Sequence, residues 1–76
     1  MSTTIKIADT TAIYSDLVAA FVAGNRAGDG TAWSPADGDS VLYRAASDDE
    51  VDVVVRNGET WLVGDVHGPW AVRFAV

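Results

Sequence analysis

The segment VDVVVRNGETWLVG, residues 51–64, constrains the fold of this chain more than any other feature of its sequence. Apolar residues alternate along both halves of the segment, and Asn57 and Gly58 lie between them. An Asn-Gly pair suits the two central positions of a type I′ turn, which joins neighbouring antiparallel strands through a two-residue loop. The segment therefore predicts a β-hairpin made of residues 51–56 and 59–64.

The turn also fixes which side chains of the hairpin lie opposite one another. A two-residue loop at this point pairs Val54 with Trp61 and Val53 with Leu62. We extended this register on the assumption that the connections to the neighbouring strands are symmetric. The pairs it then predicts are Leu42 with Val55, Tyr43 with Val54, Leu62 with Val72, and Trp61 with Arg73.

This register divides the predicted sheet into two faces of different character, since successive side chains of a strand point to opposite sides. The first face is nearly all apolar and comprises Leu42, Arg44, Ala46, Val51, Val53, Val55, Thr60, Leu62, Trp70, Val72 and Phe74. The second face mixes aromatic, aliphatic and charged residues and comprises Val41, Tyr43, Asp52, Val54, Arg56, Glu59, Trp61, Val63 and Arg73. An aromatic centre with charged neighbours is typical of a protein-binding patch. Two alternatives remain: the second face is the ordinary solvent side of a sheet, or the 24–40 loop covers it through Trp33.

A single amphipathic helix is predicted at residues 12–23, because apolar residues recur there at spacings of three and four. Residues 9–11 offer N-cap side chains, and Gly24 with Asn25 offers a left-handed C-cap. The strands are expected at residues 4–7, 41–46, 51–56, 59–64 and 70–76. Residues 24–40 form a long irregular loop, which Trp33 is expected to anchor and in which residues 34–37 could form one helical turn.

These elements predict a single α+β domain spanning residues 1–76. It is a small two-layer domain in the order β-α-β-β-β-β, with one main helix packed on a mostly antiparallel sheet of four to five strands. The strand at residues 4–7 is expected at a sheet edge, and residues 41–76 form an antiparallel meander. A domain of this size gains a net stability of only about 3–5 kcal/mol from its core, and the chain has no cysteine to add a disulfide.

The charge of the chain argues against nucleic acid as a direct partner. Eleven acidic residues against five basic ones give a formal charge of −6, and no basic stripe is present to neutralise phosphates. An acidic surface suits a partner protein with a basic surface. The start of the chain lacks the basic segment of a signal peptide, and the apolar run at residues 17–23 is too short to span a bilayer. We therefore expect a soluble, intracellular, cytoplasmic protein without membrane contact.

No set of residues with an evident catalytic or metal-binding pattern stands out. His67, the one histidine, lies in a predicted turn beside Asp65, and turn histidines next to acids are usually inert. The acidic clusters at residues 37–39 and 48–52 do not follow the spacing of a calcium-binding loop. We expect no enzymatic activity, no cofactor and no metal.

The sequence-based hypothesis is therefore a non-enzymatic, acidic protein-binding module. It would be similar to phage-encoded inhibitors that occlude a basic, nucleic-acid-binding surface of a host protein. The residues expected to bind the partner are Tyr43, Val54, Trp61, Arg73, Asp37, Asp39, Asp48, Asp49 and Asp52. One alternative is a structural subunit, such as a virion decoration or connector protein, that packs against identical neighbours through the second face or through the edge of strand 70–76. A lesser alternative is a small metal-binding protein or enzyme that uses His67 and the acidic clusters.

Overall fold

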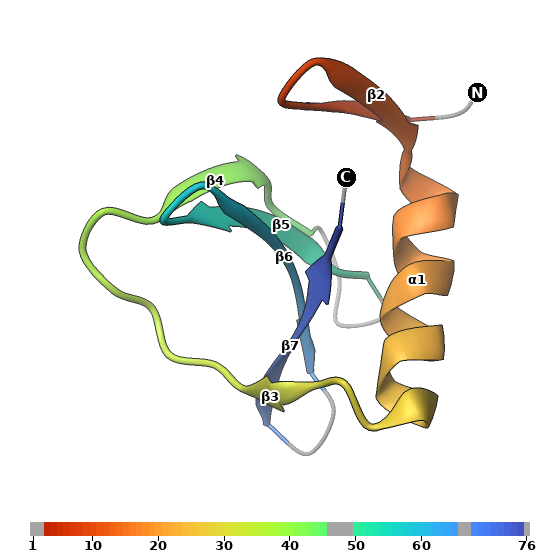
Figure 1. Cartoon of the computed structure of the whole chain (residues 1–76), viewed down its shortest axis with the longest axis vertical. Coiled ribbons are helices and arrows are strands. Elements are labelled where there is room, and N and C mark those ends of the chain that lie inside the picture. Colours follow the sequence, from red (N-terminus) through yellow and green to blue (C-terminus); the bar gives the residue numbers. More distant parts are fainter. Residues whose placement is uncertain (1–2, 46–49, 66–67, 76) are drawn as a thin grey trace.

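The computed structural model describes residues 3–45, 50–65 and 68–75. Figure 1 shows the elements in chain order, and their bounds are β1 Thr4–Ile7, β2 Thr10–Ile13, α1 Tyr14–Ala27, β3 Thr31–Ala32, β4 Ser40–Tyr43, β5 Asp52–Arg56, β6 Glu59–Asp65 and β7 Pro69–Phe74. Strands β3 to β7 form a five-stranded sheet in the order β3-β7-β6-β5-β4, and β1 with β2 forms a separate two-stranded sheet. All the pairings are antiparallel, so the protein is a small α+β domain, as predicted.

The two faces of the five-stranded sheet are covered by different parts of the chain. Helix α1 lies along one face, and the segment between β3 and β4 crosses the other (Figure 1). The cluster on the helix side contains the largest fully buried side chains, which are Ile7, Leu17, Val53 and Leu62. Both faces of the central strands are therefore buried, although a two-layer domain needs only one.

The predicted register of the central strands is confirmed. Val54 lies opposite Trp61 and Val53 lies opposite Leu62 in the β5–β6 hairpin. Its turn has positive φ angles of 54° at Asn57 and 78° at Gly58, as a type I′ turn requires. The next strand keeps the predicted pairing as well, with Leu62 opposite Val72 and Trp61 opposite Arg73.

The predicted register of the outer strand β4 is wrong. Ser40, not Leu42, lies opposite Val55, and Tyr43 lies opposite Val53 instead of Val54. Part of the shift arises because the connection between β4 and β5 is not symmetric, as the pairing of Tyr43 with Val53 shows. The rest is an irregularity of the β-bulge kind between Val41 and Tyr43, where the β4 chain carries one residue more than its partner. Beyond the extra residue every side chain changes sides, and Tyr43 therefore belongs to the helix side of the sheet.

The predicted start of the helix is also wrong. Residues 10–13 form β2 and pair with β1, so that the strand at residues 4–7 is half of a hairpin and not an edge of the main sheet. The β-branched residues of this segment suit a strand better than a first helical turn. The hairpin loop contains Ala8 at a φ of 53°, a conformation that alanine seldom adopts, so a tight turn at this residue was not expected.

The helix ends one turn later than predicted. It passes through Gly24 and stops at Gly28, whose φ of 80° lies in the left-handed region. The amide of Gly28 donates to the carbonyl of Asn25, and the amide of Asp29 donates to that of Gly24, as in a glycine-terminated helix. Gly24 serves close packing, because a Cβ at this position would overlap the side chain of Val72 on β7.

Close packing between α1 and β6 leads to a testable prediction. A Cβ added at Gly64 would lie 2.7 Å from Cζ of Phe21, so Gly64→Ala is expected to destabilise the protein. Overpacking of this kind costs about 1–3 kcal/mol, to be measured by urea unfolding. The control is the same substitution in a Phe21→Leu background, where the shorter side chain leaves room for the methyl group and the two losses should not add. If the losses of stability from the two substitutions add, contact with Phe21 is not the reason that position 64 requires glycine.

Candidate protein interface

The segment that crosses the second face of the sheet, residues 33–39, is called the strap here. It begins after β3, at one edge of the sheet, and ends before β4, at the other. Trp33 is only 9% exposed and packs with Val54 and Ala71, and its ring centroid lies 5.4 Å from that of Trp61. The interpretation in which the loop covers the second face through Trp33 is therefore confirmed.

Arg56 of β5 holds the strap in place. Its Nε donates to Oδ1 of Asp39 and its Nη2 donates to Oδ2, both at 2.7 Å. Nη2 also donates to the carbonyl of Ser34 at 2.8 Å, and the guanidinium carbon lies 3.7 Å from the centroid of the Trp33 ring. A bidentate ion pair combined with ring stacking is a geometry that arginine forms and lysine does not.

Asp39 also fixes the shape of the strap from within. Its Oδ2 accepts a hydrogen bond from the amide of Ala36 at 3.0 Å, and its own amide donates to the carbonyl of Ala36. The predicted helical turn at residues 34–37 is absent, and the structure has a turn at residues 37–38 instead. The strap is therefore an irregular segment with one aromatic anchor, Trp33, and one ionic anchor, Asp39.

The ionic anchor predicts a specific dependence of stability on pH. The side-chain hydrogen bond from Arg56 lowers the pKa of Asp39 from 3.8 to about 2. A carboxylate with a depressed folded-state pKa stabilises the fold above its unfolded-state pKa, and this contribution is lost as the pH falls from 3.8 towards 2. In Asp39→Asn, the urea midpoint should therefore fall less between these pH values than in the original protein.

The matched control for this pH dependence is Asp37→Asn, an exposed position in the same strap. This variant should keep the decline that the unchanged protein shows between the two pH values. Equal declines in the unchanged protein and in Asp39→Asn would contradict the role given to the ion pair with Arg56.

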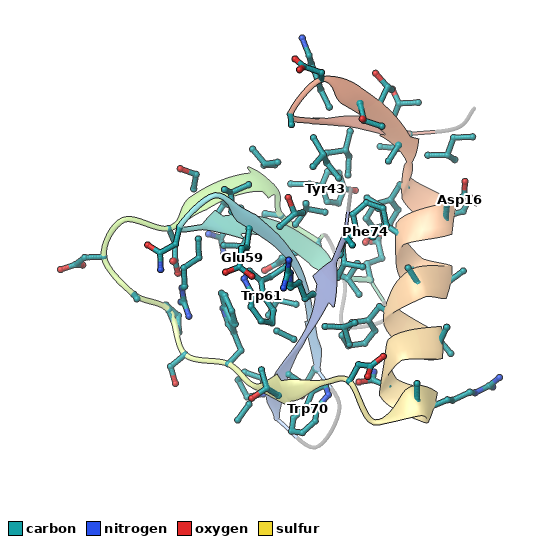
Figure 2. The ribbon with its side chains drawn as sticks, in the orientation of Figure 1. Asp16, Tyr43, Glu59, Trp61, Trp70 and Phe74 are labelled. Atoms are coloured by element: carbon teal, nitrogen blue, oxygen red, sulfur yellow. The ribbon has the colours of Figure 1, made fainter. Side chains whose placement is uncertain are left out.

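The aromatic residues expected to bind a partner lie on both sides of the sheet. Figure 2 shows Trp61 on the strap side, whereas Tyr43 projects towards α1. Tyr43 packs on the helix-side core with its ring centroid 4.7 Å from that of Tyr14, so the prediction that it shares a face with Trp61 is wrong, for the reason given by the bulge. Val54 is 5% exposed beneath Trp33, and Trp61 is half-buried beside it. Because the strap covers this face of the sheet, little of the predicted aromatic patch is exposed to solvent.

The charged residues expected to bind a partner have separate environments. Arg73 is exposed and forms an ion pair with Glu59 at 3.1 Å. Asp37 is exposed on the strap, whereas the charge of Asp39 is matched by Arg56. Asp52 accepts a hydrogen bond from the amide of Ala45 at 2.6 Å. Asp48 and Asp49 lie outside the described residues.

Three acidic residues of the protein line an open groove with a volume of about 440 Å³. It lies where β4 and β6 end and where β5 and β7 begin. Three carboxylates and one guanidinium line it, and the complete lining is Arg44, Ala45, Glu50, Asp52, Val63, Gly64, Asp65, Gly68 and Pro69. This lining is called the acidic groove. Because three negative groups face one positive group, it suits a cationic side chain of a partner.

The first residue of the helix holds one wall of the acidic groove in place. The hydroxyl of Tyr14 donates to the carbonyl of Val51 at 2.8 Å and accepts from the amide of Val51 at 2.7 Å. Burial raises the pKa of this hydroxyl, so it stays protonated and keeps its donor. Because Val51 lies between Glu50 and Asp52, these two bonds fix the backbone that carries both carboxylates.

The sequence shows each acidic residue of the groove, but it did not lead us to predict that these residues line one groove. Glu50 and Asp52 belong to one predicted acidic cluster, and Asp65 was considered only as a partner of His67, which lies outside the described residues. Since β5 begins where β6 ends in an antiparallel hairpin, the register itself places Asp52 opposite Val63, two residues from Asp65. This pairing is the signal that could have brought the acids together, whereas Arg44 depends on the bulge in β4.

Comparison with known proteins gives no match to a family model, to a curated protein or to a solved structure. Within residues 3–45, 50–65 and 68–75, no group of three or more histidine, cysteine or acidic side chains is placed to hold a metal ion. None of the helices in these ranges combines the length and apolar character needed to cross a membrane.

Proposed function

We propose that this protein is a non-enzymatic, acidic module that binds a basic surface of another protein. The acidic groove is the observation that carries the proposal, because it gathers three carboxylates around one concave surface of a chain with a formal charge of −6. Complementary charges of this kind speed the encounter with a basic partner and fix its orientation. The strap already fills the aromatic face with Trp33, which favours the groove as the place where the partner binds.

The proposed biological role is that of an inhibitor, similar to phage-encoded proteins that occlude a nucleic-acid-binding surface. Surfaces that bind nucleic acid are rich in lysine and arginine, because they neutralise phosphates. An acidic protein with a groove for cationic side chains would compete for the same residues. The inhibitor is therefore expected to exclude nucleic acid from its partner.

The test begins with capture of the partner from the native host by the tagged protein, followed by affinity measurements on the purified pair. The dissociation constant should rise steeply between about 0.05 M and about 0.5 M salt, because screening weakens a charge-driven interface. The groove variant Glu50→Gln/Asp65→Asn should weaken binding by about tenfold. The control variant Asp9→Asn/Asp29→Asn, which removes the same charge from exposed positions outside the groove, should leave affinity nearly unchanged.

A competition experiment tests the inhibitor role separately. Adding this protein should release a labelled oligonucleotide from the captured partner, and the groove variant should do so less well. Binding that neither salt nor the groove variant alters would overturn the proposal. If binding depends on the groove but never displaces nucleic acid, the protein is still a protein-binding module, and the proposed inhibitor role is wrong.

A further inference from the structure

Strand β4 forms one edge of the five-stranded sheet. It pairs with β5 on its inner side, and within the described residues no other strand pairs with it. Strand β1 comes close to β4 but belongs to the separate two-stranded sheet. An edge strand of this kind presents backbone donors and acceptors that a strand from another chain can use.

The side chains of β4 do not protect this edge. Its sequence, Ser-Val-Leu-Tyr, contains none of the lysine or proline residues that commonly block strand addition, and the bulge between Val41 and Tyr43 is the one protective feature of this strand. Val41 is 45% exposed and Leu42 is 41% exposed, so two neighbouring apolar side chains face solvent. At the opposite edge of the sheet, β3 has only two residues and offers a much shorter template.

The edge leads directly into the acidic groove. Arg44 and Ala45, which follow β4, are both part of the groove lining, and the Oδ1 atom of Asp52 binds the amide of Ala45. An extended segment lying along β4 would therefore have one of its ends beside Arg44 and Ala45, at the β4 side of the acidic groove. The acidic groove therefore begins at the residue that follows the end of β4.

We propose that an extended segment of a basic partner protein adds as a strand to β4, packs apolar side chains on Val41 and Leu42, and places a lysine or arginine in the acidic groove. This inference rests on the proposed function and specifies its mode of binding. Backbone hydrogen bonds would provide affinity, and the apolar pair with the groove would provide specificity. Charge favours a basic segment over a second copy of this chain, because two copies each carry a formal charge of −6 and repel one another.

Calorimetric titration with synthetic peptides tests this mode of binding. The main probe is a capped peptide of about ten residues with alternating valine and threonine in its centre and lysines at both ends. A second probe has the same sequence with alternate backbone nitrogens methylated on the edge that would face β4. Because methylation removes donors but keeps every charge, it should weaken binding by about tenfold or more. A third probe carries glutamate in place of lysine and should not bind detectably.

Protein variants locate the binding site on β4. Leu42→Lys should weaken binding of the main peptide by about tenfold, because it places a positive charge in the path of a cationic strand. Val22→Lys is the matched control, since Val22 is also 41% exposed and lies on α1, away from β4 (Figure 1). This control adds the same charge and should leave the affinity of the peptide nearly unchanged.

The outcomes separate the inference from the proposed function. Equal binding of the methylated and unmethylated lysine peptides would overturn strand addition and leave the acidic binding module in place. Equal binding of the lysine and glutamate peptides, with loss on methylation, would retain strand addition and overturn the preference for a basic partner. Concentration-dependent dimers abolished by Leu42→Lys, or an absence of binding by every peptide, would overturn the inference.

Discussion

Replacing Leu62 with alanine is expected to destabilise the protein by about 3 kcal/mol, as is usual for a fully buried leucine. Leu62 is 0% exposed at the centre of β6 and belongs to the cluster between the sheet and α1. A domain of this size has a net stability of only about 3–5 kcal/mol, so the variant should keep no more than about 2 kcal/mol. Urea unfolding followed by far-ultraviolet circular dichroism measures the effect.

Leu42→Ala is the matched control for this prediction, because it removes the same atoms from an exposed leucine of the same sheet. Its effect on the free energy of unfolding should stay within about 0.5 kcal/mol. Similar losses in the two variants would contradict the assignment of Leu62 to the core and Leu42 to the surface.

Replacing Trp33 with alanine is expected to destabilise the protein by about 3 kcal/mol, near the lower end of the range for a large aromatic side chain. The substitution uncovers Val54 and Ala71, removes the ring beside Trp61, and leaves Arg56 without its stacking partner. Because the ion pair between Asp39 and Arg56 still holds the strap, the loss of stability should lie below the upper end of this range. The free energy of unfolding from urea titration is the quantity to compare.

Trp33→Phe provides the control, since a smaller ring still covers part of the same surface. Its stability should lie between those of the unchanged protein and Trp33→Ala. A neutral effect of Trp33→Ala would show that the strap does not seal the second face of the sheet, and the aromatic patch would then become available to a partner.

The parts of the fold that could be predicted depend on local signals. The Asn57-Gly58 turn sets the β5–β6 register by itself, and the assumption of a symmetric connection between β6 and β7 carries this register on to β7. The anchoring role of Trp33 was also predictable, because burying the large aromatic side chain of a polar loop against the rest of the protein is favourable.

The parts that could not be predicted depend on contacts between distant residues. The register places Glu59 opposite Arg56, but the guanidinium binds Asp39, which lies 17 positions away along the chain. The bulge in β4 has no signature in the Ser-Val-Leu-Tyr sequence, and it moves Tyr43 to the opposite face. Gly24 was expected to end the helix. In the structure the helix continues past it, and the absence of a side chain at Gly24 lets Val72 pack closely against the helix.

The same distinction explains the candidate interface. The sequence showed an excess of acids and a second face with aromatic residues, and the structure covers that face with the strap. It brings the carboxylates of Glu50, Asp52 and Asp65 to one groove, at the end of β4. The alternative of self-association through strand 70–76 stays a prediction, although β3 pairs with β7 at Trp70 and Ala71 and so occupies part of that edge.

The most direct test of this account is amide and indole chemical-shift mapping by nuclear magnetic resonance during titration with the lysine-flanked peptide. We expect the largest shifts at the amides of Ser40–Tyr43 and of the groove residues, with the indole signals of Trp33 and Trp61 unchanged. Shifts concentrated on these two indoles, with β4 and the groove unaffected, would contradict the account and place the partner beneath an opened strap.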